Sequence, residues 1–65
     1  MKELDAIESA YQAAVENLYR VLSESLIFAK GDAAEEAKAK NAFKKGLDFN
    51  KKVYDTAKAI LEAQG

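Results

Sequence analysis

A short stretch near the middle of the chain decides the fold: Lys30-Gly31-Asp32-Ala33-Ala34-Glu35. Glycine readily adopts the left-handed conformation that commonly follows a helix, and a lysine in the last helical turn suits the negative end of the helix dipole. Asp32 can cap a following helix through its carboxylate, and Glu35 stands three residues later, where a capping box places its acid. The stretch therefore predicts that one helix ends and another begins within about two residues.

The segments on both sides of this turn show helical periodicity. Before the turn, residues recur at alternating spacings of three and four and form a heptad seam. The seam consists of Leu4, Ile7, Tyr11, Ala14, Leu18, Val21, Ser25 and Phe28, and Val15 and Leu22 widen it on one side. After the turn, residues 44–64 form three units of seven, KKGLDFN, KKVYDTA and KAILEAQ, each with a lysine first and an acid fifth. These patterns predict helices over about residues 3–29 and 33–63, which the short turn makes antiparallel.

The seven-residue repeat also predicts how the second helix is oriented. Its third and fourth positions lie on the predicted seam with Phe43, Asn50 and Ala57, and they are Gly46-Leu47, Val53-Tyr54 and Ile60-Leu61. The acids Asp48, Asp55 and Glu62 each follow a lysine by four residues, so outward ion pairs are expected. Asn50 has two equally weighted interpretations, because a buried Asn fixes register or oligomeric state whereas a solvated one lies at the rim of the seam.

Gly46 allows an alternative fold. A glycine inside a helix costs about 1 kcal/mol relative to alanine, so a break at Gly46-Leu47-Asp48 would give a three-helix bundle. Against this, the seven-residue repeat passes through position 46 without a change of phase, and a glycine on the seam lets two helices approach closely. We therefore predict an all-α, antiparallel two-helix hairpin that forms a single domain over residues 1–65.

The predicted core of this hairpin is thin. Thirteen of the 32 apolar residues are alanines, so nineteen have side chains large enough to build a core. In so short a chain, apolar burial and a conformational entropy loss of about 1.5 kcal/mol per residue nearly cancel. We therefore expect a partner, either a helical protein or a second copy, and the predicted assembly is a homodimeric four-helix bundle of the coiled-coil type.

Apolar side chains near the turn form the candidate interface. Helix 3–29 carries large residues there, whereas the facing stretch 33–42 carries nothing apolar larger than alanine. On a helical wheel several of the large residues lie about 100° or more from the seam centre, and Phe49 flanks the seam of the second helix. The candidate interface consists of Tyr19, Leu22, Leu26, Ile27, Phe28 and Phe49. Scattered surface residues are the alternative interpretation, but clustering favours association.

The composition argues against catalysis. The chain has no histidine and no cysteine, and no base accompanies its hydroxyl groups, so we expect no enzymatic activity, catalytic residue, cofactor or metal site. Ser23 and Ser25 are better explained as helix residues that bond back to the preceding turn. The lack of cysteine and of an apolar leader favours a cytoplasmic location. The longest large-apolar run, Leu26-Ile27-Phe28, is far below the ~18 residues of a membrane span.

Seven lysines in the second helix are the one feature that suggests a polyanion partner. A formal net charge of −1 and the interleaved acids favour a solvated, salt-bridged face instead, so nucleic-acid binding is not expected. The sequence thus predicts a small non-enzymatic module for protein–protein interaction or assembly that self-associates. A subunit or co-chaperone of an obligate heteromeric complex is one alternative, and a nucleic-acid-binding bundle is another.

The predicted layout is similar to that of two unrelated groups of small proteins. In length and topology it resembles the plasmid Rop-type RNA-binding hairpins, which dimerise into four-helix bundles. It also resembles the small helical-hairpin partners of type III secretion needle chaperones. No sequence motif carries either resemblance, and a shared topology does not imply a shared function.

Overall fold

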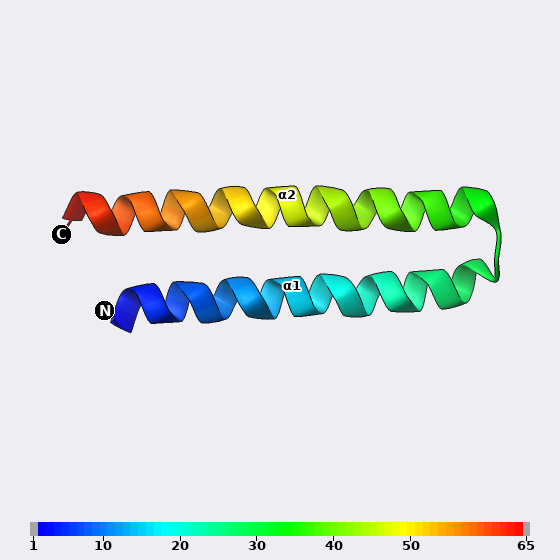
Figure 1. The fold of residues 1–65 in the computed structure, drawn as a ribbon, viewed down its shortest axis with the longest axis horizontal. Coiled ribbons are helices and arrows are strands. Elements are labelled where there is room, and N and C mark those ends of the chain that lie inside the picture. Colours follow the sequence, from blue (N-terminus) through cyan, green and yellow to red (C-terminus); the bar gives the residue numbers. More distant parts are fainter. Residues whose placement is uncertain (1, 65) are drawn as a thin grey trace.

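Two long helices make up the protein. The computed structural model describes residues 2–64 and consists of α1, Lys2–Ala29, and α2, Ala33–Gln64, which run antiparallel (Figure 1). The predicted all-α hairpin is confirmed, with each helix boundary within one residue of its expected position. The Cα atoms extend over 50 × 16 × 7 Å. The molecule is therefore a single layer of two helices with two broad faces.

The turn reverses the chain through two residues with left-handed backbone. Lys30 has φ 52° and Gly31 has φ 81°, so the predicted role of Gly31 is confirmed. Lys30, however, lies just beyond α1 and not in its last turn as predicted, because the chain changes direction within two residues. The Asp32 N–H donates to the Ala29 carbonyl at 2.9 Å and closes the turn.

Asp32 begins α2 as predicted, but only half of the expected capping box forms. The Glu35 N–H donates to Asp32 Oδ1 at 3.0 Å. The reciprocal bond from the Asp32 N–H to the Glu35 carboxylate does not form, because that N–H already donates to Ala29. The Glu35 carboxylate instead pairs with Lys38 Nζ at 3.3 Å.

α2 continues through Gly46, so the three-helix alternative with a break at Gly46-Leu47-Asp48 is wrong. Gly46 faces Leu18 of α1, and a Cβ at position 46 would lie 2.6 Å from Leu18 Cδ2. No side chain fits there without displacing Leu18. Gly46 lowers the helix propensity of α2, but its lack of a side chain lets the two helices approach closely at the middle of the hairpin.

Six of the eight seam residues predicted for α1 are half-buried, so the seven-residue pattern is confirmed in part. The buried and half-buried positions of α1 include three sets spaced by eleven: Leu4, Val15 and Leu26; Ile7, Leu18 and Ala29; Tyr11 and Leu22. The predicted seam residues Val21 and Phe28 are instead 46% and 81% exposed. In a straight helix a seven-residue stripe rotates by about 20° per heptad, so these two positions turn away from α2.

The same correction applies to α2. Its buried and half-buried positions include Ala39, Asn50 and Leu61; Phe43 and Tyr54; Gly46 and Ala57. Val53 and Ile60, which were predicted to lie on the seam, are 48% and 54% exposed. Because eleven residues span close to three helical turns, these spacings stay on the line between the helices. The seven-residue repeat stays on this line at Leu47, Tyr54 and Leu61 and leaves it at Val53 and Ile60.

The close approach at Gly46 can be tested by substitution. Gly46→Val should lower the free energy of unfolding by about 1–2 kcal/mol, because overpacking against Leu18 outweighs the better helix propensity of valine. In a Leu18→Ala background, the same change should be neutral or stabilising, since the space is then free. Urea denaturation of the four proteins at one fixed concentration measures both effects.

Lys45→Val is the control, because it places valine at an exposed neighbouring position of α2. It should shift the free energy of unfolding by no more than ~0.5 kcal/mol. Equal losses from Gly46→Val in both backgrounds would contradict the packing of Gly46 against Leu18.

Candidate association surface

Residues 2–64 hold none of the arrangements that usually mark a chemical site. They contain no group of three acidic side chains that could hold a metal ion. Neither helix has a window apolar enough to cross a lipid bilayer within this part of the chain. No side-chain nitrogen or oxygen described by the structure is buried without a hydrogen-bond partner. The property that distinguishes this molecule is its exposed apolar surface.

Among residues 2–64 seven large hydrophobic side chains are exposed, and they are Tyr19, Val21, Ile27, Phe28, Phe49, Val53 and Ile60. In the same range only Ala29 and Ala39 are buried, with 7% and 8% of their surface still exposed. The accessible surface of 5110 Å² exceeds the value of about 4,100 Å² expected for a folded monomer of this mass. The radius of gyration is 15.2 Å, against about 11 Å for a compact domain of this length.

Helix geometry separates the two broad faces of the layer. Leu18 and Gly46 face one another and define the line of contact. With about 100° per residue, a side chain three positions later points about 60° to one side, and one four positions later points about 40° to the other. Because the helices run antiparallel, the same offset leads to the same broad face in α1 and α2. Val21 and Phe49, each three positions on, therefore share a face.

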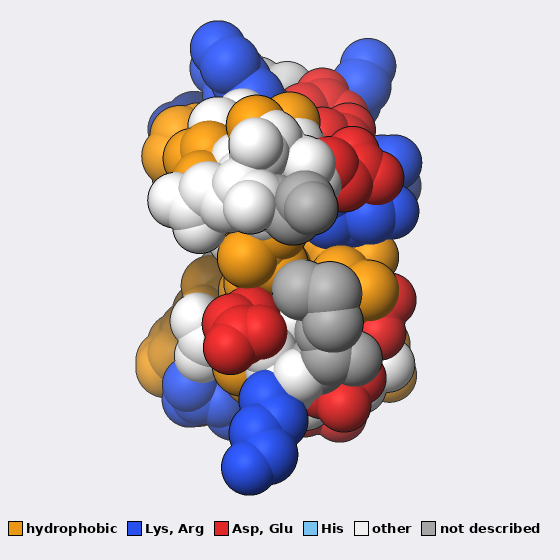
Figure 2. Space-filling model, turned by 90° about the vertical axis from the view of Figure 1, so that its left-hand side faces the viewer, with side chains coloured by type: hydrophobic (Ala, Val, Ile, Leu, Met, Phe, Trp, Pro, Cys, Tyr) orange, Lys and Arg blue, Asp and Glu red, His pale blue; other side chains and the backbone are white. Residues whose placement is uncertain are grey.

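We call this side the phenylalanine face and define it by the exposed side chains Val21, Phe28, Phe49, Val53 and Ile60. It holds five of the seven exposed large hydrophobic residues. Seen from the open end of the hairpin, hydrophobic side chains lie between the helices and along the left flank of both, whereas charged side chains gather mainly at the outer edges (Figure 2). The face thus carries exposed apolar side chains from both helices.

Small side chains alternate with large ones on the phenylalanine face. Near the turn, Phe28 borders a shallow depression floored by Ala39 and Ala42 of α2. Toward the open end, Val53 of α2 borders a depression that Ala10 of α1 and Ala57 of α2 line together with Ile7 and the two tyrosines. Small side chains thus lie beside large ones at both ends of the face.

We call the opposite side the tyrosine face and define it by Tyr11 and Tyr54, which make contacts there with charged side chains. The rings of Tyr11 and Tyr54 stack across the helices with centroids 4.8 Å apart. Tyr54 donates a hydrogen bond to Glu8 Oε2 at 3.2 Å, and Lys58 Nζ lies 5.2 Å from the Tyr54 ring centroid. Within residues 2–64 the Tyr54–Glu8 bond is the only hydrogen bond between the two helices. The two faces therefore differ in chemistry.

The structure divides the six predicted interface residues among three directions. Phe28 and Phe49 lie on the phenylalanine face. Leu22 and Leu26 lie on the tyrosine side of the contact line and are half-buried, and Tyr19 lies at the edge of that side. The Ile27 side chain points away from α2 and is 73% exposed.

Sequence analysis did not include Val21, Val53 and Ile60 in the interface, because the heptad pattern assigned them to the seam. The signal that could have found them is the rotation of a seven-residue stripe around a straight helix.

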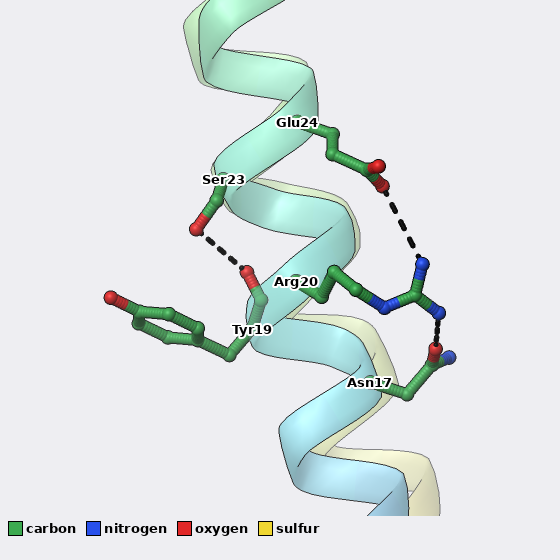
Figure 3. A network of polar contacts seen from close by, with 5 residues as sticks. All are labelled: Asn17, Tyr19, Arg20, Ser23 and Glu24. Carbon is green, nitrogen blue, oxygen red and sulfur yellow. Dashed lines mark hydrogen bonds and ion pairs between the residues drawn. The ribbon is translucent and has the colours of Figure 1, made fainter.

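Polar contacts at the outer edge of α1 are local. Arg20 lies between Asn17, to which it donates a hydrogen bond, and Glu24, whose Oε1 is 3.9 Å from its Nη1 (Figure 3). Ser23 Oγ donates to the Tyr19 carbonyl at 3.0 Å, which confirms the predicted back-bonding for Ser23; the back-bonding of Ser25 stays a prediction. The Tyr19 ring points away from the helix, on the opposite side from Arg20 (Figure 3). These contacts link no residue of α1 to α2.

The polar residues of α2 are likewise satisfied within their own helix. Of the three predicted lysine–acid pairs, only Lys51 and Asp55 are in contact in the described part of the chain, at 3.6 Å. Asn50 is half-buried, and its Nδ2 donates to the Gly46 carbonyl at 2.9 Å. Its amide thus has a partner without a second chain, and the two interpretations of Asn50 reduce to a seam residue bonded to its own helix.

Comparisons with protein-family models, with curated proteins and with solved structures found no match. The function is therefore argued from the surface and charges of this chain.

The tyrosine pair should stabilise the hairpin through ring packing more than through its hydrogen bond. Tyr54→Ala should lower the free energy of unfolding by about 2–3 kcal/mol, because it removes a half-buried ring stacked on Tyr11. Tyr54→Phe keeps the ring and loses only an exposed hydrogen bond to Glu8, so it should cost less than about 1 kcal/mol. Chemical denaturation at matched concentration measures both. Equal losses would contradict this ranking.

Proposed function

We propose that this chain is a small non-enzymatic interaction module that self-associates into a homodimeric four-helix bundle and acts in assembly. The observation that carries the proposal is an apolar face left uncovered on a layer only two helices wide. Its five large side chains are each at least 46% exposed. Burial of apolar surface, and not bond chemistry, is the process that this molecule supports.

The surface area supports an interface of ordinary size. The chain exposes about 1,000 Å² more than a compact monomer of its mass would, and a standard interface buries about 800 Å² on each partner. The excess therefore matches what one stable interface needs. Because stable domains generally consist of two packed layers, a second hairpin would supply the layer that this one lacks.

The charge of the chain does not oppose self-association. With ten basic and eleven acidic residues the net charge is −1, so two copies repel one another only weakly. The residues that define the phenylalanine face are all apolar, and the lysines of α2 lie beside this face and not on it. These properties support a second copy as the partner.

Solution mass is the direct test. At micromolar concentration, multi-angle scattering should give twice the chain mass of 7.1 kDa, and the melting temperature should rise with protein concentration, because dimerisation stabilises the folded chain by mass action. A monomer that melts cooperatively at a concentration-independent temperature would falsify the proposal. A poorly helical monomer would favour the alternative of a subunit in an obligate heteromeric complex.

A nucleic-acid assay tests the remaining alternative. At physiological salt, a retardation assay with duplex DNA and structured RNA should show at most weak binding that disappears as salt rises, because acids offset the lysines of α2. Tight binding that is lost in a variant with Lys44, Lys45, Lys51 and Lys52 changed to Ala would support a nucleic-acid-binding bundle instead.

A further inference from the structure

We infer that a second copy of this chain covers the phenylalanine face with both turns at the same end, so that α1 of one copy lies over α2 of the other. The inference rests on the proposed function and adds the face and the orientation. Three properties of the hairpin carry it: the distribution of exposed apolar residues, the alternation of large and small side chains, and the unequal charges of the two helices.

The choice of face follows from the cost of removing water. Covering the phenylalanine face buries Phe28, Phe49 and the three aliphatic residues that define it. The charged side chains that line its depression near the turn, Glu35 and Lys38, pair with one another at 3.3 Å. Covering the tyrosine face would bury the Glu8 carboxylate and the Lys58 ammonium around Tyr54. Burying charged groups is costly unless they are fully paired. A second copy therefore gains most, and loses least, on the phenylalanine face.

Shape complementarity admits a second copy in either of two orientations. Within one hairpin, a residue of α1 and a residue of α2 lie at the same height along the helix axes when their numbers sum to about 64, as those of Leu18 and Gly46 do. With both turns at the same end, Val21 lies over Ala42 of the second copy, and Val53 lies over Ala10. With the turns at opposite ends, each helix lies over its own equivalent, and large residues again meet alanines. Shape thus favours a two-fold dimer but does not choose its orientation.

Charge distinguishes the two orientations. α1 carries five acidic side chains against Lys2 and Arg20, a net charge of −3, whereas α2 carries seven lysines against five acids, a net charge of +2. With the turns at the same end, each helix has only helices of opposite net charge beside it. With the turns at opposite ends, α1 would lie over α1 and α2 over α2. Helix dipoles are antiparallel in both cases and favour neither.

The distances make this charge difference effective. Packed helices have axes about 8–10 Å apart, which is close to the screening length of about 8 Å at physiological ionic strength. Lys38, Lys45 and Lys52 lie along the edge of α2 that borders the phenylalanine face. They would meet the same lysines of a second copy if the turns were at opposite ends. With the turns at the same end these lysines would lie over α1 instead, and Lys38 would come near the level of Glu24. Electrostatic complementarity of this kind selects orientation more than it raises affinity.

A pair of neighbouring substitutions tests the face. Phe28 and Ile27 are 81% and 73% exposed, but only Phe28 lies on the phenylalanine face. Phe28→Lys should raise the dimer dissociation constant at least about tenfold, because it strands an ammonium in an apolar contact. Ile27→Lys makes the same change of charge and should leave the mass unchanged. Sedimentation of both variants beside the parent measures this, with circular dichroism to confirm helical content.

Val53→Lys is the second variant, because it changes the same face on the other helix and near the other end. It should also dissociate the dimer. Dissociation by Ile27→Lys, or an unchanged dimer in both Phe28→Lys and Val53→Lys, would overturn the choice of face. These results test the choice of face alone. The mass of the parent protein tests the proposed function, because a monomeric parent would refute it whatever the variants do.

Spin labels test the orientation. Ala34→Cys places a label at an exposed position beside the turn, so two labels should lie within about 30 Å of each other when the turns share one end. With the turns at opposite ends, the labels would be separated by nearly the full hairpin length of 50 Å. Glu16→Cys, near the middle of α1, is the control, since its label distance barely depends on orientation. A long Ala34 distance in a dimeric parent would overturn the inferred orientation.

Discussion

Two straight helices touch along a single line, and this limit on contact determines the rest of the structure. Only the side chains nearest the line can be shielded by the other helix, so each helix keeps most of its circumference in water. The closest point of the line is the contact of Leu18 with the backbone of Gly46, where a Cβ would lie 2.6 Å from Leu18 Cδ2. Within residues 2–64 the only buried residues are Ala29 and Ala39, close to the turn.

The exposed apolar face is a consequence of two periods that coexist in one sequence. The contact line follows the eleven-residue spacing, which a straight helix with about 3.6 residues per turn keeps in nearly constant direction. The apolar repeat of seven residues drifts off the line by about 20° per heptad. In α1 the drift carries Val21 and Phe28 onto the phenylalanine face, and in α2 it carries Val53 and Ile60 there. Four of the residues that were expected to close the hairpin therefore form part of its outer surface.

Polar interactions add little to this arrangement. The ion pairs Arg20–Glu24, Glu35–Lys38 and Lys51–Asp55 are formed within single helices between exposed side chains, and pairs of this kind contribute at most a few tenths of a kcal/mol. Their collective charge is more informative, because it makes α1 acidic and α2 basic. The one polar link between the helices, Tyr54 to Glu8, lies on the tyrosine face. Apolar burial and net helix charge are thus the two properties on which association depends.

The sequence by itself determined the features that depend on neighbouring residues. Gly31 and Asp32 specify the turn and the start of α2 through left-handed backbone and a capped N–H, and the unbroken repeat through position 46 indicates one continuous second helix. The tight approach expected of Gly46 is likewise present. The turn, the cap and the continuity of α2 follow from interactions within a few residues, whereas the approach at Gly46 was indicated by the place of a glycine on the repeat.

Only the tertiary structure decided which side of each helix meets the other. The rotation of a helix about its own axis is set by packing along its whole length, and a difference of about 20° per heptad accumulates until Val21 and Phe28 lie outside the contact and Leu22 and Ala29 lie inside it. The sequence contains both spacings, and nothing local distinguishes them. For this reason the predicted interface included Phe28 and Phe49 but left Val53 and Ile60 on the seam: their exposure depends on how the two helices are turned toward one another.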